Sequence, residues 1–282
     1  MNHIKIFSDS TCDLPKSLLE RYDIGIIPLY VTFGDDAFRD GVDMTPPEMY
    51  KRVEECGKLP KTSSPSPADF MQAFEPFVKE GRNILYIGLS SHLSSTIQNA
   101  TIAGEMLGEG SVTVIDSLNL STGIGIPVLK AAMALEAGTS LEDTVKLVED
   151  VRGKMETEFI IDTLDYLYKG GRCSGLQNLI GSLLRIRPVI KVVDGKMTPA
   201  NKIRGKREKA LEQLKQNALD HVNEMDKDIV FVTHSLSLDD AQMLQEELKQ
   251  KTGAKHVFLS DCGCVISSHC GPNTIGIVYA RK

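Results

Sequence analysis

The sequence predicts an α/β protein made of two α/β domains, with a parallel sheet in the N-terminal domain and a mixed sheet in the C-terminal domain. Short β-rich runs alternate with helical patterns through the first half, which is typical of βαβ units around a parallel sheet. In the second half, Asp194-Gly195 joins two strand patterns, and this dipeptide favours a tight hairpin turn. The chain of 282 residues is long enough for both domains.

The predicted elements of the first half alternate in order. Strands are predicted over residues 3–10, 24–33, 83–90 and 111–117, and helices over 47–56, 67–80, 95–107 and 125–137. The helix after Ser66 has a clear start, because serine is a favoured N-cap and Pro67 suits the first turn. Thr11 or Asp13 is expected to cap a helix that begins near Pro15.

A helical pattern over residues 141–155 precedes the second half. Strands are predicted there over residues 158–163, 187–195, 196–205, 228–235, 254–263 and 275–282. We place the N-terminal domain at residues 1–155 and the C-terminal domain at residues 156–282.

Composition excludes several classes of protein. The net charge of −6 and the isoelectric point near 5.6 argue against a nucleic-acid partner. The basic residues of 186–209 are expected to form a solvated hairpin and helix start, although an acidic protein partner stays possible there. The amino-terminal residues lack the basic and apolar regions expected of a signal peptide, and no apolar run is long enough for a membrane span. We therefore expect a soluble, cytoplasmic protein with free thiols and no stable membrane insertion.

Serine and threonine residues gather where the predicted strands end, the place where open α/β sheets bind ligands. Thr62 and Ser63 lie upstream of the Ser66 cap and are not explained by it. Ser91, His92 and Ser94 follow the strand over 83–90, but the GxSxG signature of a hydrolase is absent. Hydroxyls and backbone N–H groups at these turns are better suited to hold an anion than to act in a serine hydrolase.

Two further stretches leave alternatives open. Gly170 and Gly171 are expected to end a short helix, and Arg172 beside them is suited to a carboxylate or to an acidic partner. Cys262, Cys264, His269 and Cys270 lie within nine residues, but their spacing fits no common zinc site. We expect a turn at Gly271-Pro272 that carries His269 to a pocket, and cysteines that are buried packing residues.

Several motifs occur together in one order along the chain. They are Asp9 to Pro15, residues 26–43, Thr62-Ser63 with Pro65-Ser66, Leu93 to Thr96, Asp116-Ser117, Leu164 to Arg172, Arg187-Pro188, and His269 to Gly276. With them the chain, from residue 4 to about residue 280, resembles the DegV family, the fatty-acid-binding subunits of bacterial fatty acid kinase.

The resemblance implies one long-chain fatty acid, such as palmitate, held between two domains, with no other cofactor and no metal. It implies that Thr62 and Ser94, with Ser63 close by, bind the carboxylate, that His269 lies near this head group, and that Arg172 docks the kinase. Ser95 replaces a usual glycine and is a second candidate hydroxyl. In this scheme the chain is not itself an enzyme, because a separate fatty acid kinase catalytic subunit phosphorylates the bound acyl group.

A fatty acid suits this sparse set of polar residues. Burial of about fourteen methylenes is worth roughly 11 kcal/mol before the cost of ordering, so the carboxylate needs few donors. The apolar patterns at residues 179–186 and 124–135 are candidates for the cavity wall, but such patterns are more often plain core, so no residue that contacts the tail is named. The alternatives are a serine/histidine acyl-ester hydrolase and a zinc site at the cysteines.

Overall fold

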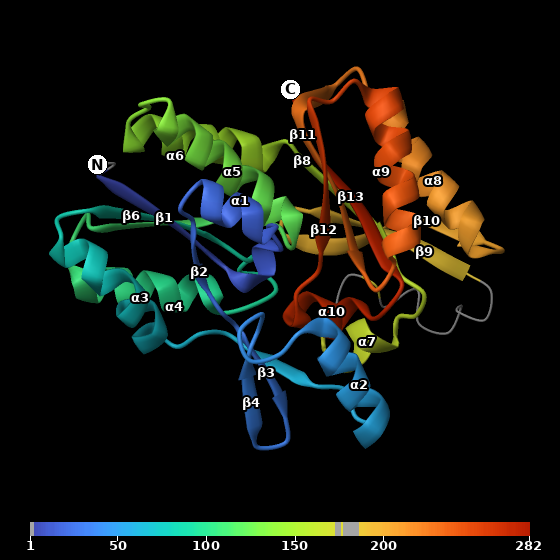
Figure 1. Ribbon diagram of the computed structural model, residues 1–282, viewed down its shortest axis with the longest axis horizontal. Coiled ribbons are helices and arrows are strands. Elements are labelled where there is room, and N and C mark those ends of the chain that lie inside the picture. Colours follow the sequence, from blue (N-terminus) through green and yellow to red (C-terminus); the bar gives the residue numbers. More distant parts are fainter. Residues whose placement is uncertain (1–2, 173–175, 177–185) are drawn as a thin grey trace.

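Two main sheets organise the chain, one parallel and one mixed, as predicted (Figure 1). The computed structural model describes residues 3–172, 176 and 186–282. The expected apolar wall at residues 179–186 lies almost wholly outside this range. Figure 1 shows the parallel sheet and its helices beside the mixed sheet and its helices.

The first sheet is fully parallel, with the order β2-β1-β6-β7. Its strands are β1 (Ile4–Asp9), β2 (Gly25–Ile27), β6 (Asn83–Gly88) and β7 (Val112–Asp116). Helices α3 (Pro67–Lys79) and α4 (Thr96–Leu107) cover one face, and α5 (Thr122–Glu136) and α6 (Leu141–Gly153) cover the other (Figure 1). Ser66 caps α3 as predicted, since its Oγ accepts the Asp69 N–H at 3.3 Å.

The prediction of one strand over residues 24–33 is wrong, because this segment forms two strands that belong to two different sheets. Pro28 lacks a backbone donor and separates β2 from β3 (Tyr30–Phe33). Strand β3 lies between β4 (Asp36–Arg39) and β5 (Lys61–Ser63) in a small antiparallel sheet. Helix α2 (Pro46–Cys56) follows β4.

The second sheet has the order β10-β9-β8-β13-β11-β12, and only its β11–β12 pair is parallel. Its strands are β8 (Met155–Ile160), β9 (Ile186–Val193), β10 (Lys196–Arg204), β11 (Met225–Ser235), β12 (His256–Asp261) and β13 (Thr274–Arg281). Asp194 and Gly195 both have positive φ at the β9–β10 turn, which confirms the predicted hairpin.

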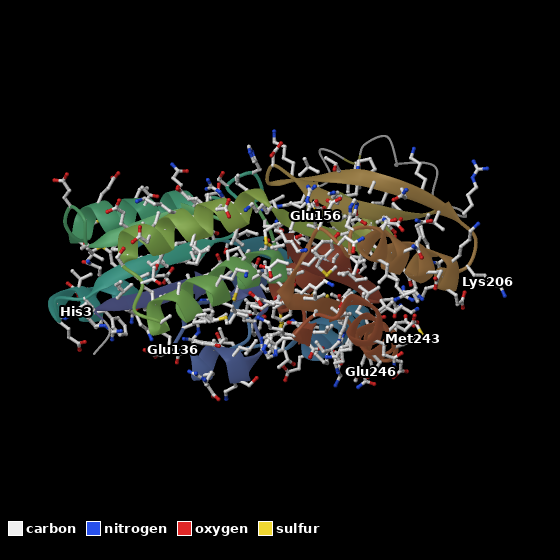
Figure 2. All side chains as sticks on the ribbon, turned by 90° about the horizontal axis from the view of Figure 1, so that it is seen from above. His3, Glu136, Glu156, Lys206, Met243 and Glu246 are labelled. Carbon is white, nitrogen blue, oxygen red and sulfur yellow. The ribbon has the colours of Figure 1, made fainter. Side chains whose placement is uncertain are left out.

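Helices contact both faces of this second sheet, two helices of the second half on one face and α5 and α6 of the first half on part of the other. Helices α8 (Arg207–Asp220) and α9 (Leu238–Thr252) pack on the alternate strand residues that include Val230, Val232 and Ile277. The residues between these face the first half of the chain. The basic segment is an exposed hairpin and helix start, as expected, and Figure 2 shows Lys206 at the outer end of this half.

Two short helices lie where the halves meet. Helix α7 (Asp165–Lys169) ends at the Gly170-Gly171 pair, as predicted, and α10 (Cys264–Cys270) contacts α2, α7, β3 and β5. The turn predicted at Gly271-Pro272 is present, but the helix before it was not predicted, and His269 lies on the last turn of that helix. The cysteines, serines and β-branched residues of this segment are weak helix formers, which is why the helix was missed.

Two buried carboxylates of the first half bind the start of α10. Asp40 accepts the N–H groups of Cys264 at 2.6 Å and of Val265 at 3.3 Å, and Asp13 accepts the N–H of Gly263 at 2.8 Å. Asp13 therefore does not cap the helix after Pro15, whose N-cap has no side-chain bond. Between them the two carboxylates satisfy three backbone donors of this turn.

We predict that Asp40→Ala lowers the free energy of unfolding by about 2 kcal/mol, because two buried N–H groups lose their acceptor. Asp40→Asn keeps one acceptor oxygen and should cost less. Urea unfolding of the three proteins gives the comparison. An Asp40→Ala variant as stable as the unchanged chain would contradict the assigned role.

Candidate functional site

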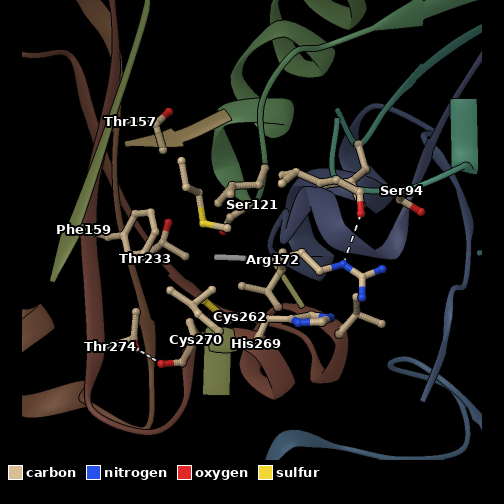
Figure 3. A pocket seen from close by; sticks show the side chains of 18 of the residues that line it. Ser94, Ser121, Thr157, Phe159, Arg172, Thr233, Cys262, His269, Cys270 and Thr274 are labelled. Atoms are coloured by element: carbon tan, nitrogen blue, oxygen red, sulfur yellow. Dashed lines mark hydrogen bonds between the residues drawn. The ribbon is translucent and has the colours of Figure 1, made fainter. Parts of the chain in front are cut away.

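A cavity lies between the two halves of the chain, and its empty space together with the open solvent at its mouth is about 860 Å³ (Figure 3). Leu89, Leu93 and Ser94 reach it from the segment after β6, and Leu120 and Ser121 reach it from the segment after β7. The carboxyl ends of the parallel strands thus supply one wall, as expected for an open α/β sheet. The second sheet supplies the facing wall.

Polar side chains gather at one end of this cavity. They are Thr62, Ser63, Ser64, Ser94, Arg172 and His269. Ser63 is exposed and the others are half-buried, so this end lies nearest to solvent. The structure therefore brings Thr62, Ser63, Ser94 and His269 to one cavity, although they come from three distant parts of the sequence.

His269 is the most constrained member of the polar end. Its Nε2 lies 2.8 Å from the Thr62 hydroxyl, and its buried Nδ1 has no hydrogen-bond partner among the described residues. Burial, helped by the charge of Arg172, lowers the pKa of His269 to about 4. At neutral pH the ring is therefore uncharged, with one N–H to donate.

Gly170 makes room for this imidazole. A Cβ on Gly170 would lie 2.2 Å from His269 Nδ1, so a larger residue would displace the ring. The sequence pattern explained Gly170 only as the end of a helix, and its contact with a residue 99 positions away left no local signal. The glycine serves both purposes.

Arg172 also lines the cavity, close to the polar end (Figure 3). Its Nη1 donates to the Gly170 carbonyl at 2.7 Å and its Nε donates to the Leu93 carbonyl at 3.3 Å. These bonds hold the guanidinium beside the hydroxyl groups. This place on the cavity wall agrees with the carboxylate alternative that the sequence left open for Arg172.

The structure separates the two neighbouring serine candidates. Ser94 lines the cavity, and its Oγ lies 2.8 Å from the Thr96 hydroxyl. Ser95 is not among the residues that line the cavity. Its Oγ instead lies 2.9 Å from the hydroxyl of Ser64, on the exposed side of the turn.

The opposite end of the cavity is apolar, even where threonines line it. Thr157 donates to Asn119 at 2.9 Å, Thr233 pairs with Thr122 at 2.6 Å, and Thr274 donates to the Cys270 carbonyl at 2.9 Å. Thr157 and Thr274 donate to protein acceptors and the Thr122 and Thr233 hydroxyls bond to each other, so the threonines of this wall leave a ligand at most one hydroxyl proton. The apolar residues of this wall are Leu29, Leu89, Phe159, Leu167 and Met197.

The tail-facing residues were not predicted individually. The structure excludes a cavity wall from residues 124–135 and confirms the other interpretation of this apolar pattern, because Ile124, Ile126 and Leu129 lie in the core between sheet and helices. A helix that is apolar all round leaves its cavity-facing side undefined in sequence.

The three clustered cysteines are buried, as predicted. Cys262 and Cys270 line the cavity, and Cys264 donates to the Met44 carbonyl at 3.2 Å. Burial raises the pKa of the Cys264 thiol well above its usual range, so it stays protonated at neutral pH. Within the described residues, no group of three or more histidine, cysteine, aspartate or glutamate residues could hold a metal ion.

We predict that His269 makes the ligand-free protein sensitive to acid. Its folded pKa of about 4 lies below the unfolded value of 6.5, so its share of stability is complete above pH 6.5 and is lost as the pH falls toward 4. Between pH 7 and pH 4.5 this amounts to about 2–3 kcal/mol. Urea unfolding at both pH values measures the loss of unfolding free energy, which should be smaller by that amount in His269→Asn than in the unchanged chain. Equal losses in the two proteins would contradict the prediction.

Comparisons with known proteins agree with this geometry. The family model described as "Uncharacterised protein, DegV family" matches residues 3–282. A fatty acid-binding protein of Thermotoga maritima is 36% identical, with 99% of each chain covered. A DegV domain-containing protein of Clostridium perfringens is 32% identical over the whole of both chains.

Solved structures show the same fold. A DegV family protein from Thermus thermophilus, described by its fatty acid binding, has a TM-score of 0.92, 32% identity and 99% coverage of both chains. A stearic acid-binding protein from Eubacterium ventriosum has a TM-score of 0.91 and 29% identity, with 99% of this chain and 98% of that chain covered. No helix of the described residues is both long and apolar enough to cross a bilayer. By the match of its whole described length, the chain belongs to the DegV family.

Proposed function

We propose that the cavity binds one long-chain fatty acid, with its carboxylate among Thr62, Ser63, Ser94 and His269. The observation that carries this proposal is the polarity of the cavity, which has hydroxyls, an imidazole and a guanidinium at its open end and satisfied threonines among leucines at the other. A fatty acid is likewise polar at its carboxylate and apolar along its tail. The fatty acid-binding and stearic acid-binding relatives support the same ligand class.

The electrostatics of the open end suit a single carboxylate. A neutral His269 donates one hydrogen bond without the desolvation cost of a second cation. Arg172 supplies the one positive charge among the described residues that line the cavity. The apolar tail then contributes most of the affinity, and the head group mainly sets the orientation.

We further propose that the chain acts in the cytoplasm by presenting this carboxylate to a separate fatty acid kinase, with no catalysis of its own. The half-exposed polar end supports it, because a carboxylate there lies near solvent. Arg172, near that opening, is our candidate for contact with the kinase.

We also propose that the two domains meet at residue 155. The start of β8 at Met155 supports this boundary, because β8 is the first strand of the second sheet along the chain.

The hydrolase alternative gains no support from the geometry. His269 bonds to Thr62 and not to Ser91 or Ser94, and among the described residues no carboxylate orients its Nδ1. A serine hydrolase needs both contacts.

The purified protein should contain an extractable long-chain fatty acid, or bind added palmitate or oleate. Mass spectrometry of the native protein and of its lipid extract measures the first, and titration of delipidated protein measures the second. A protein that neither carries nor binds fatty acid would refute the proposed function.

Loss of a head-group hydroxyl should weaken binding. Thr62→Ala and Ser94→Ala each remove one hydrogen-bonding group, with an expected loss of about 1–3 kcal/mol. Titration calorimetry with one fatty acid measures the change. Thr101→Ala on the exposed face of α4 is the matched control, and Ser95→Ala should cost less than Ser94→Ala because its hydroxyl contacts Ser64. Equal affinities of the Ser94→Ala variant and the unchanged chain would exclude the Ser94 role.

A further inference from the structure

Phe159 faces the cavity from the middle of the second sheet. The register places Phe159 opposite Gly276, and Gly276 opposite Thr233, so these three residues form one row across β8, β13 and β11. Figure 3 shows Phe159 and Thr233 on the side of the cavity opposite Ser94. The row therefore forms part of the wall that faces away from the polar end.

Exposure falls along the cavity in the same direction. Ser63 is exposed and Ser94 is half-buried, whereas Phe159 is 7% and Thr233 is 4% exposed. A ligand whose carboxylate stays at the polar end therefore directs its methyl end toward the buried side. Phe159 is the largest side chain on the described part of that wall.

Gly276 fixes the place of Phe159. A Cβ on Gly276 would lie 3.1 Å from the Phe159 Cβ and 3.0 Å from the Glu158 carbonyl oxygen, so a larger residue would have to push β8 away from β13 by a few tenths of an ångström. Strand β8 is also paired with β9 on its other side, which holds its backbone. Met197 nearby has a flexible thioether chain that can adjust to a ligand.

We propose that Phe159, held against Gly276, sets the longest acyl chain that the cavity accepts. This inference rests on the proposed fatty acid binding and deepens it. A tail that grows by one methylene gains affinity until its end meets a side chain that cannot move aside. Phe159 is that side chain, because a ring is stiff and its backbone cannot retreat.

The test is a series of saturated fatty acids with increasing chain length, titrated into delipidated protein. For the unchanged chain, Kd should fall by about fourfold per added methylene and then stop falling at a limiting length. Phe159→Leu should move this limit to a longer chain, and an acid two carbons beyond the old limit should bind the variant about tenfold more tightly than the unchanged chain. Phe159→Val should move the limit at least as far, and either variant alone decides the question if the other does not fold.

Phe231→Leu is the matched control. Phe231 is fully buried in the same sheet and packs on Phe258 with ring centroids 5.2 Å apart, but it does not line the cavity. Its variant should keep the original limit. Fatty acid binding with the same limit in the unchanged chain and both Phe159 variants would overturn this inference and leave the proposed function intact. An unchanged chain that binds no acid of any length would overturn both.

Discussion

The arrangement of the site depends on two buried carboxylates that cross between the halves of the chain. Asp13 and Asp40 belong to the first half, and both accept backbone N–H groups at the start of α10 in the second half. Burial raises the pKa of both carboxyl groups, and the hydrogen bonds that they accept oppose this shift. Through α10 they position His269 beside Thr62, which belongs to the first half again.

The same constraint shapes the cavity. Because α10 is held against the first half, the face of the second sheet that points away from α8 and α9 lies across the cavity from the carboxyl ends of the parallel strands. Threonines on that face bond to neighbouring protein groups and leave at most one hydroxyl proton for a ligand. The site is therefore polar at one end only, and this division of polarity is more specific than any single residue in it.

Much of the fold was predictable because it depends on local patterns. The Ser66 cap, the Asp194-Gly195 hairpin and the Gly170-Gly171 helix end all use residues with strong backbone preferences. The errors fall where a local pattern met a tertiary constraint. Pro28 divided one apparent strand between two sheets, and α10 forms from weak helix formers because Asp40 binds its first turn.

The sequence by itself determined the alternation of elements, the family and the hydroxyl-rich segments that meet at the site. Side-chain chemistry and spacing within one segment carry that information. Only the tertiary structure decided which hydroxyls face the cavity, that Ser94 does and Ser95 does not, and that Arg172 lies beside His269. Those choices depend on contacts between residues far apart in the chain, such as Gly170 against His269 and Gly276 against Phe159, and no local pattern encodes them.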